Sequence, residues 1–427
     1  MRRLLGNEKL IVGYDLGDDY SQISYCISDG DVETLSSVAG AENFNIPTVL
    51  CKREQVNQWF YGKEALRYAD ENRGILVKDL LRLAVEGEEI QIEGKTFDPV
   101  ALLTLFVKRS LGMLVAIAPP DRIDALMITC DELSHRMLEV LSQVVAGLKI
   151  KMNQVSFQNH TESFYNYMIH QPEELWTRQA LLCDYRSGRV KVFRMECNRR
   201  TTPIVAYIGN EEYPFLQYEP MPDTESLRRE KMERLDRELL ELMTEVCGDA
   251  MISTVYLIGE DYSEEWMKES LRFLCRGRRV FLGSNLYSKG ACFGMLERQS
   301  ASETGKNYVF LGNDKLKANI GMKVLRRGTE SYYALLDAGV NWFEAERTME
   351  CYLQDGNEVE LMITPLIGKN GKIARIVLEN LPAGIRRLQI HLYLKEENRL
   401  VAEITDLGLG ELQAATGHVW QEEIDLY

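Results

Sequence analysis

The sequence predicts an α/β protein with two lobes, residues 1–305, followed by an antiparallel β-sandwich, residues 306–427. Two observations lead to the α/β and β-sandwich classes, and the two lobes follow from the paired hairpins and the resemblance described below. Up to about residue 300, apolar runs of strand length alternate with longer stretches in which apolar residues recur at helical spacing, as in α/β layers. Beyond it, short strand-like runs are separated by turn sequences at 355–357, 369–371 and 382–384, which is the spacing of a β-sandwich.

The composition is that of an ordinary globular protein: of 427 residues, 45% are hydrophobic and 27% are charged. The formal net charge is −15, which argues against duplex nucleic acid or an anionic membrane surface as the main partner, because both select basic faces. Nine cysteines without a CxxC pair, scattered histidines and the lack of a signal-length or membrane-length apolar run predict a cytoplasmic protein with buried thiols and no zinc site.

The first segments are predicted from apolar runs and turn residues. The run 9–17 is a strand that stops at Gly17, and the run 20–30 is a second strand that ends in the Asp29-Gly30 turn. Residues 46–50 are extended, because the residue before proline avoids the helical region.

Helices follow from apolar stripes at a spacing of three and four residues, such as Val100, Leu103 and Val107. The expected helices are 63–71, 99–116, 134–147, 162–169, 223–246 and 262–275, with the start of another at 285–296. The expected strands among them are 123–129, 151–157, 178–185, 188–196, 203–209, 254–259 and 278–283, whereas 300–307 is polar and has no pattern. The sandwich strands are expected at 331–338, 347–354, 358–367, 372–379, 386–395 and 399–407.

Two strand-end turns carry aspartates. Asp15 precedes Gly17 at the end of the first strand, and Asp184 precedes a turn with Gly188 near the middle of the chain. Two similar hairpins that present an aspartate indicate two related subdomains facing a cleft. Such turns can cradle phosphates with backbone N–H groups, and aspartates can hold Mg²⁺ through its waters. Taken singly, each is also an ordinary structural turn.

The order of these segments resembles the actin-fold ATPases, most closely the DnaK-type heat-shock chaperones. The similar segments are 11–21, 45–50, 61–65, 76–81, 125–155, 159–167, 181–195, 254–265 and 285–294, and the stretch after residue 310 resembles the β-sandwich peptide-binding domain of these chaperones. The resemblance covers nearly the whole chain, although each single match is loose.

This resemblance implies ATP or ADP with Mg²⁺ as the cofactor. It places Asp15 and Asp184 at the metal through water and Lys78 at the catalytic position. The residues it places around the nucleotide are Gly17, Asp18, Asp19, Gly188, Gly259 and Gly290. It also implies a protein or peptide partner at the C-terminal sandwich, where Leu361, Ile363, Leu366 and Ile367 line either a groove or the core.

Several departures from the family pattern point to a degenerate nucleotide site. Asp18 and Asp19 stand where the family has hydroxyl residues, and each carboxylate at ~5 Å from a phosphate charge repels it by roughly 3 kcal/mol at an effective dielectric near 20. Side chains of Tyr185, Arg186 and Ser187 crowd a turn that is glycine-rich in the family. In addition, Asn159 stands in place of a metal-side glutamate, and Glu260-Asp261 follows Gly259.

The length pattern differs as well, because only about 60 residues separate the second hairpin from strand 254–259, where the chaperones have a further subdomain, and no helical lid follows the sandwich. We therefore expect a degenerate chaperone relative that acts as a binding or regulatory module with weak or no ATP hydrolysis. The alternative is an active, Mg-ATP-dependent chaperone-like ATPase that binds extended peptides. An actin-like filament protein is a third possibility, which the appended sandwich disfavours.

Overall fold

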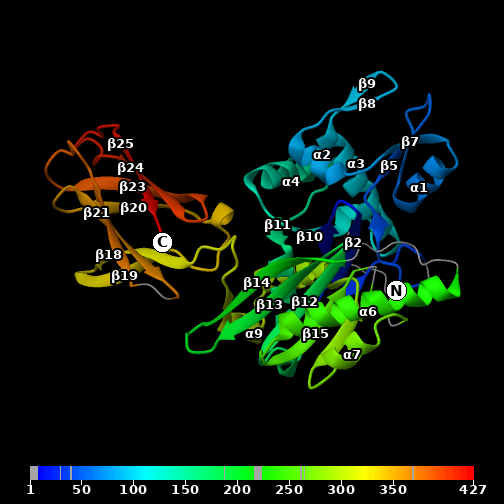
Figure 1. The fold of residues 1–427 in the computed structure, drawn as a ribbon. Helices are drawn as coiled ribbons and strands as arrows, with labels where there is room; N and C mark the ends of the chain where they lie inside the picture. The colour runs from blue at the N-terminus through cyan, green and yellow to red at the C-terminus, as the bar shows by residue number, and fades with distance from the viewer. Residues whose placement is uncertain are drawn as a thin grey trace. The chain divides into compact units, whose positions relative to one another are not determined.

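The computed structural model describes residues 8–28, 30–38, 41–186, 188–215, 224–259, 262–263, 265–367 and 370–427. The chain is a mixed α/β protein with several sheets and forms two compact units (Figure 1). The first unit consists of Met1–Cys197 and Ile208–Asn307, and the second of Asn198–Tyr207 and Tyr308–Tyr427. The expected division at 305/306 therefore differs in one respect, because the short stretch 198–207 belongs with the second unit.

The first sheet of the first unit has the order β11-β10-β1-β2-β3, and β4 also pairs with β2. Strand β1 is antiparallel to β2 and parallel to β10, which is in turn parallel to β11. Their bounds are Leu10–Leu16 for β1, Tyr20–Ile27 for β2, Glu33–Thr34 for β3, Ile46–Pro47 for β4, Ile123–Cys130 for β10 and Gln154–Asn159 for β11. All of β1 is buried because both of its faces are covered.

Successive β1 residues face different helices, as the alternation of a strand requires. Gly13 lies so close to helix α8 (Leu286–Gln299) that an added Cβ would be 2.3 Å from the backbone nitrogen of Cys292. The next residue, Tyr14, donates to or accepts from Ser110 of α3 (Pro99–Leu111) over 2.7 Å.

The second sheet repeats this pairing pattern in the order β16-β15-β12-β13-β14-β17, where β17 is Tyr308–Phe310. Strand β12 is antiparallel to β13 and parallel to β15, which is parallel to β16. Their bounds are Gln179–Arg186 for β12, Arg189–Asn198 for β13, Ile204–Pro214 for β14, Ile252–Ile258 for β15 and Arg279–Gly283 for β16. Each sheet thus contains a hairpin whose first strand has two parallel strands on its other side.

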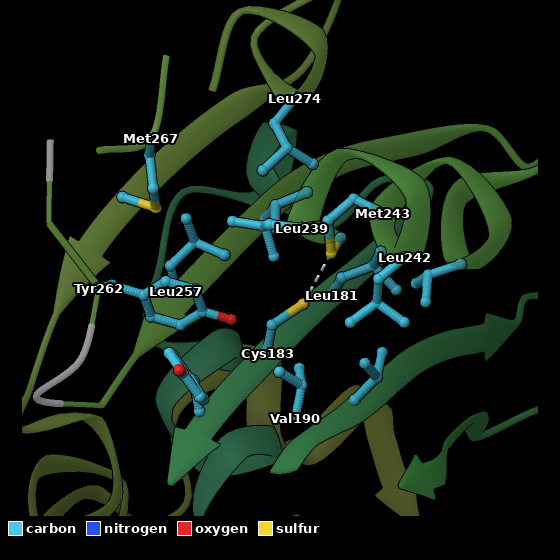
Figure 2. Close-up of a cluster of buried hydrophobic side chains, with 14 of the residues drawn as sticks. Leu181, Cys183, Val190, Leu239, Leu242, Met243, Leu257, Tyr262, Met267 and Leu274 are labelled. Atoms are coloured by element: carbon cyan, nitrogen blue, oxygen red, sulfur yellow. Dashed lines mark hydrogen bonds between the residues drawn. The ribbon is translucent and has the colours of Figure 1, made fainter. Parts of the chain in front are cut away.

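Helix α6 (Glu225–Cys247) covers one face of the second sheet (Figure 2). Leu181, Cys183 and Tyr185 of β12 are fully buried in this core, where Leu239 and Met243 of α6 meet them. The Cys183 and Met243 sulfur atoms lie 3.9 Å apart. Because side chains alternate along a strand, Asp184 and Arg186 belong to the opposite face.

Helices α3 and α4 (His135–Leu148) of the first unit begin where the sequence supplies a side-chain cap. Asp98 accepts from the Val100 N–H at the start of α3, and Ser134 accepts from the Met137 N–H at the start of α4. Other elements of this unit are β5 Leu50–Arg53, β6 Trp59–Tyr61, α1 Gly62–Asp70, β7 Gly74–Val77, α2 Leu80–Glu86, β8 Ile90–Ile92, β9 Lys95–Phe97, α4 His135–Leu148, α5 His160–Ile169, α7 Glu269–Leu274 and α9 Glu303–Asn307.

The second unit contains two four-stranded antiparallel sheets, β19-β18-β21-β22 and β20-β23-β24-β25. Their bounds are β18 Ala318–Arg326, β19 Thr329–Leu336, β20 Glu346–Leu353, β21 Glu358–Pro365, β22 Lys372–Val377, β23 Arg386–Glu396, β24 Arg399–Asp406 and β25 Val419–Asp425. Strand β17 (Tyr308–Phe310) pairs with the first residues of β14. Leu361 and Ile363 are fully buried, so these two residues are core and line no groove.

Some expected elements differ from the structure. The helix predicted for 262–275 is confined to α7, because Trp266 and Met267 are buried before it and buried Asp236 accepts from the Glu269 and Ser270 N–H groups at its start. The patternless stretch 300–307 contains α9, and strands β18 and β25 were not predicted. Five residues with predicted roles lie outside the described residues, namely Asp29, Ser187, Asp223, Glu260 and Asp261.

Among the described residues, one helical stretch, Pro99–Ala116, is long and apolar enough to cross a membrane, with a mean hydropathy of 1.6. It corresponds to α3 and a following 3₁₀ turn (Gly112–Ala116), and 44% of it is buried inside the structure. Its buried side chains include Leu103, Phe106 and Val107, and it packs against α2 and α4. A core helix satisfies the same length and composition test.

Candidate functional site

The two aspartates predicted from the hairpin turns both lie at carboxyl ends of parallel strands in the first unit. Asp15 is opposite Thr129 of β10, and Asp184 is opposite Ile258 of β15. Their exposed fractions are 1% and 8%. In open α/β sheets, ligands bind at this end of the strands, so the location is one where a functional site is expected.

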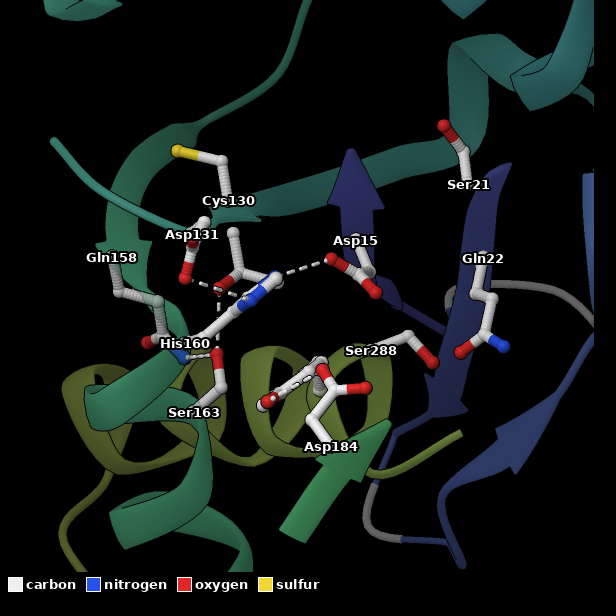
Figure 3. A network of polar contacts seen from close by, with 12 residues as sticks. Asp15, Ser21, Gln22, Cys130, Asp131, Gln158, His160, Ser163, Asp184 and Ser288 are labelled. Carbon is white, nitrogen blue, oxygen red and sulfur yellow. Dashed lines mark hydrogen bonds and ion pairs between the residues drawn. The ribbon is translucent and has the colours of Figure 1, made fainter. Parts of the chain in front are cut away.

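Asp15 is held by a histidine that the sequence reasoning did not select. The Nε2 atom of His160, the first residue of α5, lies 2.8 Å from Asp15 Oδ1 (Figure 3). Its Nδ1 atom is 3.7 Å from Asp131 Oδ1, which also accepts from Lys191 Nζ over 2.5 Å. Burial alone would raise the pKa of Asp131, but the His160 and Lys191 charges lower it below its ordinary value.

Asp184 is engaged from two sides. Arg186 Nε donates to Asp184 Oδ1 over 2.7 Å, and the Tyr287 hydroxyl of α8 donates to Oδ2 over 3.1 Å. The Tyr287 ring stacks on the His160 ring with centroids 3.8 Å apart and planes 4° from parallel. The Arg186 guanidinium also lies 4.7 Å from the centroid of the Tyr20 ring on β2. A continuous chain of contacts therefore joins the two hairpins.

The electrostatics follow from this burial. Burial lowers the pKa of Arg186, but the adjacent Asp184 carboxylate outweighs it and the pKa lies well above its ordinary value. Burial and the Asp184 charge raise the pKa of the Tyr287 hydroxyl well above its usual range. Arg186 is thus a permanent cation and Tyr287 a permanent hydrogen-bond donor beside Asp184.

A cleft of about 540 Å³ opens beside this network. Its apolar lining residues are Leu16, Leu81, Val85 and Met137. Its charged lining residues are Asp18, Glu86, Asp131, Glu132, Asp184, Glu212, Arg82, Arg186, Arg189 and Lys191. Arg189 pairs with Glu212 and Lys191 with Asp131, so most of the charge that lines the cleft is balanced internally.

The acidic pair after Gly17 has a structural function. Asp18 Oδ1 accepts from the Arg82 N–H over 2.9 Å and so caps the first turn of α2. Burial raises the pKa of Asp18, and the nearby charges of Asp79 and Asp19 add to the increase. The Asp19 carbonyl accepts from the Thr48 N–H. Their contact with a nucleotide stays a prediction.

Two predicted glycines have packing reasons for lacking a side chain. An added Cβ at Gly290, inside α8, would be 2.0 Å from the Ser163 carbonyl oxygen of α5. An added Cβ at Gly259, whose φ is +123°, would be 2.2 Å from the Tyr185 carbonyl oxygen. Both positions mark close backbone approaches, whereas Gly17 lines the cleft and Gly188 follows the end of β12. A nucleotide contact at these glycines stays a prediction.

The structure separates Lys78 and Tyr185 from the cleft. Lys78 is exposed between β7 and α2 and is not among the residues that line it. The prediction that Tyr185 crowds the phosphate approach is wrong, since its ring is buried in the α6 core next to Phe215 and Tyr262. Arg186, one residue later, points to the Asp184 side. The strand alternation after Asp184 would have distinguished the two residues.

The site does not fit the hydrated Mg²⁺ that the resemblance implies. Mg²⁺ requires oxygen ligands in near-octahedral geometry. Here each Asp184 oxygen already accepts from Arg186 or Tyr287, Oδ1 of Asp15 contacts His160, and the Arg186 cation beside Asp184 repels a second cation. Within the part of the chain that the structure describes, no group of three or more His, Cys, Asp or Glu residues is arranged to hold a metal ion.

Two family models match successive parts of the chain. The sequence model of a domain of unknown function, DUF8552, matches residues 315–426. A search of curated proteins gives no match. The model described as the C-terminal part of a family of unknown function, DUF5716, matches residues 31–313, which is more than half of the chain. The chain therefore belongs to the DUF5716 family.

Proposed function

We propose that this protein is a degenerate relative of the DnaK-type chaperones in which the second unit binds an extended peptide and the first unit is a regulatory scaffold with weak or no ATP hydrolysis. The order of similar sequence segments and the repeated pairing pattern of the two sheets support the relationship. The occupied oxygens of Asp15 and Asp184 support weak or absent hydrolysis.

The observation that carries the binding function is a groove of about 1030 Å³ in the second unit. It lies where β20 and the β20–β21 turn meet the ends of β18 and β21. Its floor includes buried Met322, Val359 and Leu388. Its rim includes large apolar side chains that are exposed to an unusual extent, 58% for Leu325 and 62% for Tyr352.

An extended peptide is the occupant that fits this groove best. Strand β20 is the last strand of its sheet, so its outer edge can pair with an extended backbone. Its side chains alternate between half-buried Met349, Cys351 and Leu353 and exposed neighbours, which matches the two-residue repeat of a bound strand. Three cations and four carboxylates line the groove, namely Lys323, Arg326, Arg347, Glu350, Asp355, Glu358 and Glu360, so no strong charge preference is expected.

Fluorescence anisotropy with labelled peptides that carry a central run of leucine and valine tests the binding function. We expect Leu325→Asp and Tyr352→Asp to weaken binding at least tenfold, since each places a charge against the bound apolar side chain. Val419→Asp is the matched control, because Val419 is a comparably exposed valine on β25 outside the groove (54%). Equal affinity of all three variants, or no binding by the wild type, would refute a peptide groove at this place.

The alternative, an active Mg-ATP-dependent chaperone-like ATPase, is supported by the 540 Å³ cleft beside Gly17 and Asp184. Calorimetry with ATP and Mg²⁺ separates the two proposals. Metal-dependent heat that is lost in Asp184→Ala would favour the ATPase. No heat, together with a melting temperature that ATP leaves unchanged, would favour the regulatory scaffold.

A further inference from the structure

The positive charge between the two hairpins comes from a side chain of the protein itself, Arg186. Arg186 donates to Asp184, and its guanidinium lies 4.7 Å from the Tyr20 ring centroid and 5.7 Å from that of Tyr287. Tyr20 begins β2 of the first hairpin, whereas Arg186 ends β12 of the second. One side chain thus connects both hairpins and α8, and Asp15 is close enough to contribute to its electrostatic environment.

We propose that Arg186 is a built-in counter-cation that takes the place of a hydrated metal ion between the two aspartate-bearing hairpins and holds them together without metal or nucleotide. A planar guanidinium suits this position better than an ammonium, because it can donate in its plane to a carboxylate while it stacks on an aromatic face. Arg186 thus supplies beside Asp184 the positive charge that Mg²⁺ would otherwise bring, and the His160 ring contacts the carboxylate of Asp15.

This inference rests on the first-unit part of the proposed function and names how that unit is regulated. The two hairpins stay in contact as long as Arg186 lies between them. Its tests measure the stability of the first unit. Their outcome is independent of the peptide experiment, which measures binding in the groove of the second unit.

Thermal unfolding of the full chain with Arg186→Ala is the primary test. Removing one partner of a buried ion pair leaves the other charge unpaired, but Arg186 keeps 26% of its side chain exposed, so we expect the melting temperature of the first unit to fall by roughly 4–10 °C. Millimolar methylguanidinium, which can enter the vacated space, should restore at least half of the loss, whereas equal concentrations of NaCl should not. Arg189→Ala is the control, because Arg189 pairs with Glu212 in solvent at the other end of the same turn.

Magnesium provides the second test, and one of its two arms uses the wild type alone. Millimolar MgCl₂ should leave the melting temperature of the wild type unchanged, and should raise that of Arg186→Ala. If Arg186→Ala does not fold, Arg186→Lys keeps the charge without the planar group; we expect a lower melting temperature that MgCl₂ still leaves unchanged. The proposal is overturned by a wild type that MgCl₂ stabilises through Asp184, or by Arg186→Ala and Arg189→Ala that are equally stable.

Discussion

Replacing Gly290 with alanine tests whether this glycine is required by helix packing. The added Cβ would lie 2.0 Å from the Ser163 carbonyl oxygen, whereas ordinary contacts of this kind begin at 3.4 Å. The α5 and α8 backbones would have to separate by about 1.4 Å at this point, the difference between these two values. A carbonyl oxygen within α5 cannot rotate away as a side-chain end can.

The separation has an estimable effect on stability. A radial gap of 0.5–1 Å already forfeits roughly a quarter to a half of a dispersion contact, and α5 and α8 meet in stacked ring pairs such as His160 with Tyr287. We therefore expect a loss of about 3 kcal/mol, at the upper end of measured overpacking penalties.

Urea unfolding of the full chain, followed by far-UV circular dichroism, measures this loss in the transition of the first unit. Gly112→Ala is the matched control, because no atom would lie within 4 Å of the new Cβ and its φ is negative. If Gly290→Ala unfolds within about 0.5 kcal/mol of Gly112→Ala, which is the spread of ordinary surface substitutions, the close approach of α5 and α8 is incorrect and the packing explanation with it.

Three further predictions concern charged side chains, each read by denaturant unfolding. Asp18→Ala should destabilise the first unit by about 1 kcal/mol through loss of the α2 cap. Asp18→Asn keeps a hydrogen-bond acceptor and removes a carboxylate whose pKa is raised by burial, so it should be neutral or slightly stabilising at pH 7. Equal losses of stability in the two variants would contradict the capping role. Burial lowers the pKa of His391, but Glu346 and Glu403 raise it overall. The contribution of His391 to the stability of the second unit is therefore present below the ordinary histidine pKa and is lost as pH rises through the higher folded-state value. The effect is below about 1 kcal/mol after solvent screening, and His391→Gln should remove this pH dependence. Arg386→Met should destabilise the second unit by about 3–5 kcal/mol, because it leaves the fully buried Asp406 carboxylate without its ion-pair partner, and an unchanged midpoint would show that the pair is solvated.

The strands at the centre of each sheet could be predicted because their residues carry the information locally. The run that forms β1 is apolar and stops at Gly17, and the run that forms β23 alternates so regularly that each second side chain is buried. Strand β18 was missed because Gly321 interrupts its apolar pattern. The glycine leaves room for the Tyr332 ring of the neighbouring strand β19, since an added Cβ would be 2.4 Å from that ring. No property of the local sequence reveals such a contact.

The candidate site shows the same limit. Asp15 and Asp184 could be found from strand-end turns, and Arg186 from the missing glycines, because these signals lie within a few residues of each aspartate. His160 and Tyr287 could not, since they come from the starts of α5 and α8 and meet only in the folded chain, with ring centroids 3.8 Å apart. The residues that would distinguish the proposed metal-free contact between the hairpins from a metal site are thus contributed by distant segments.

The difference between Tyr185 and Arg186 could still have been derived before any coordinates. If Asp184 faces the cleft, strand alternation turns Tyr185 into the core and returns Arg186 to the cleft, for as long as β12 continues through Arg186. The hairpin pairs Arg186 with Arg189, so the strand does extend that far and the turn is short. A glycine-rich turn in this place would let a phosphate approach the backbone, whereas a strand that continues by two residues brings a guanidinium to the same carboxylate. Whether the site takes an external cation or supplies its own therefore depends on where β12 ends.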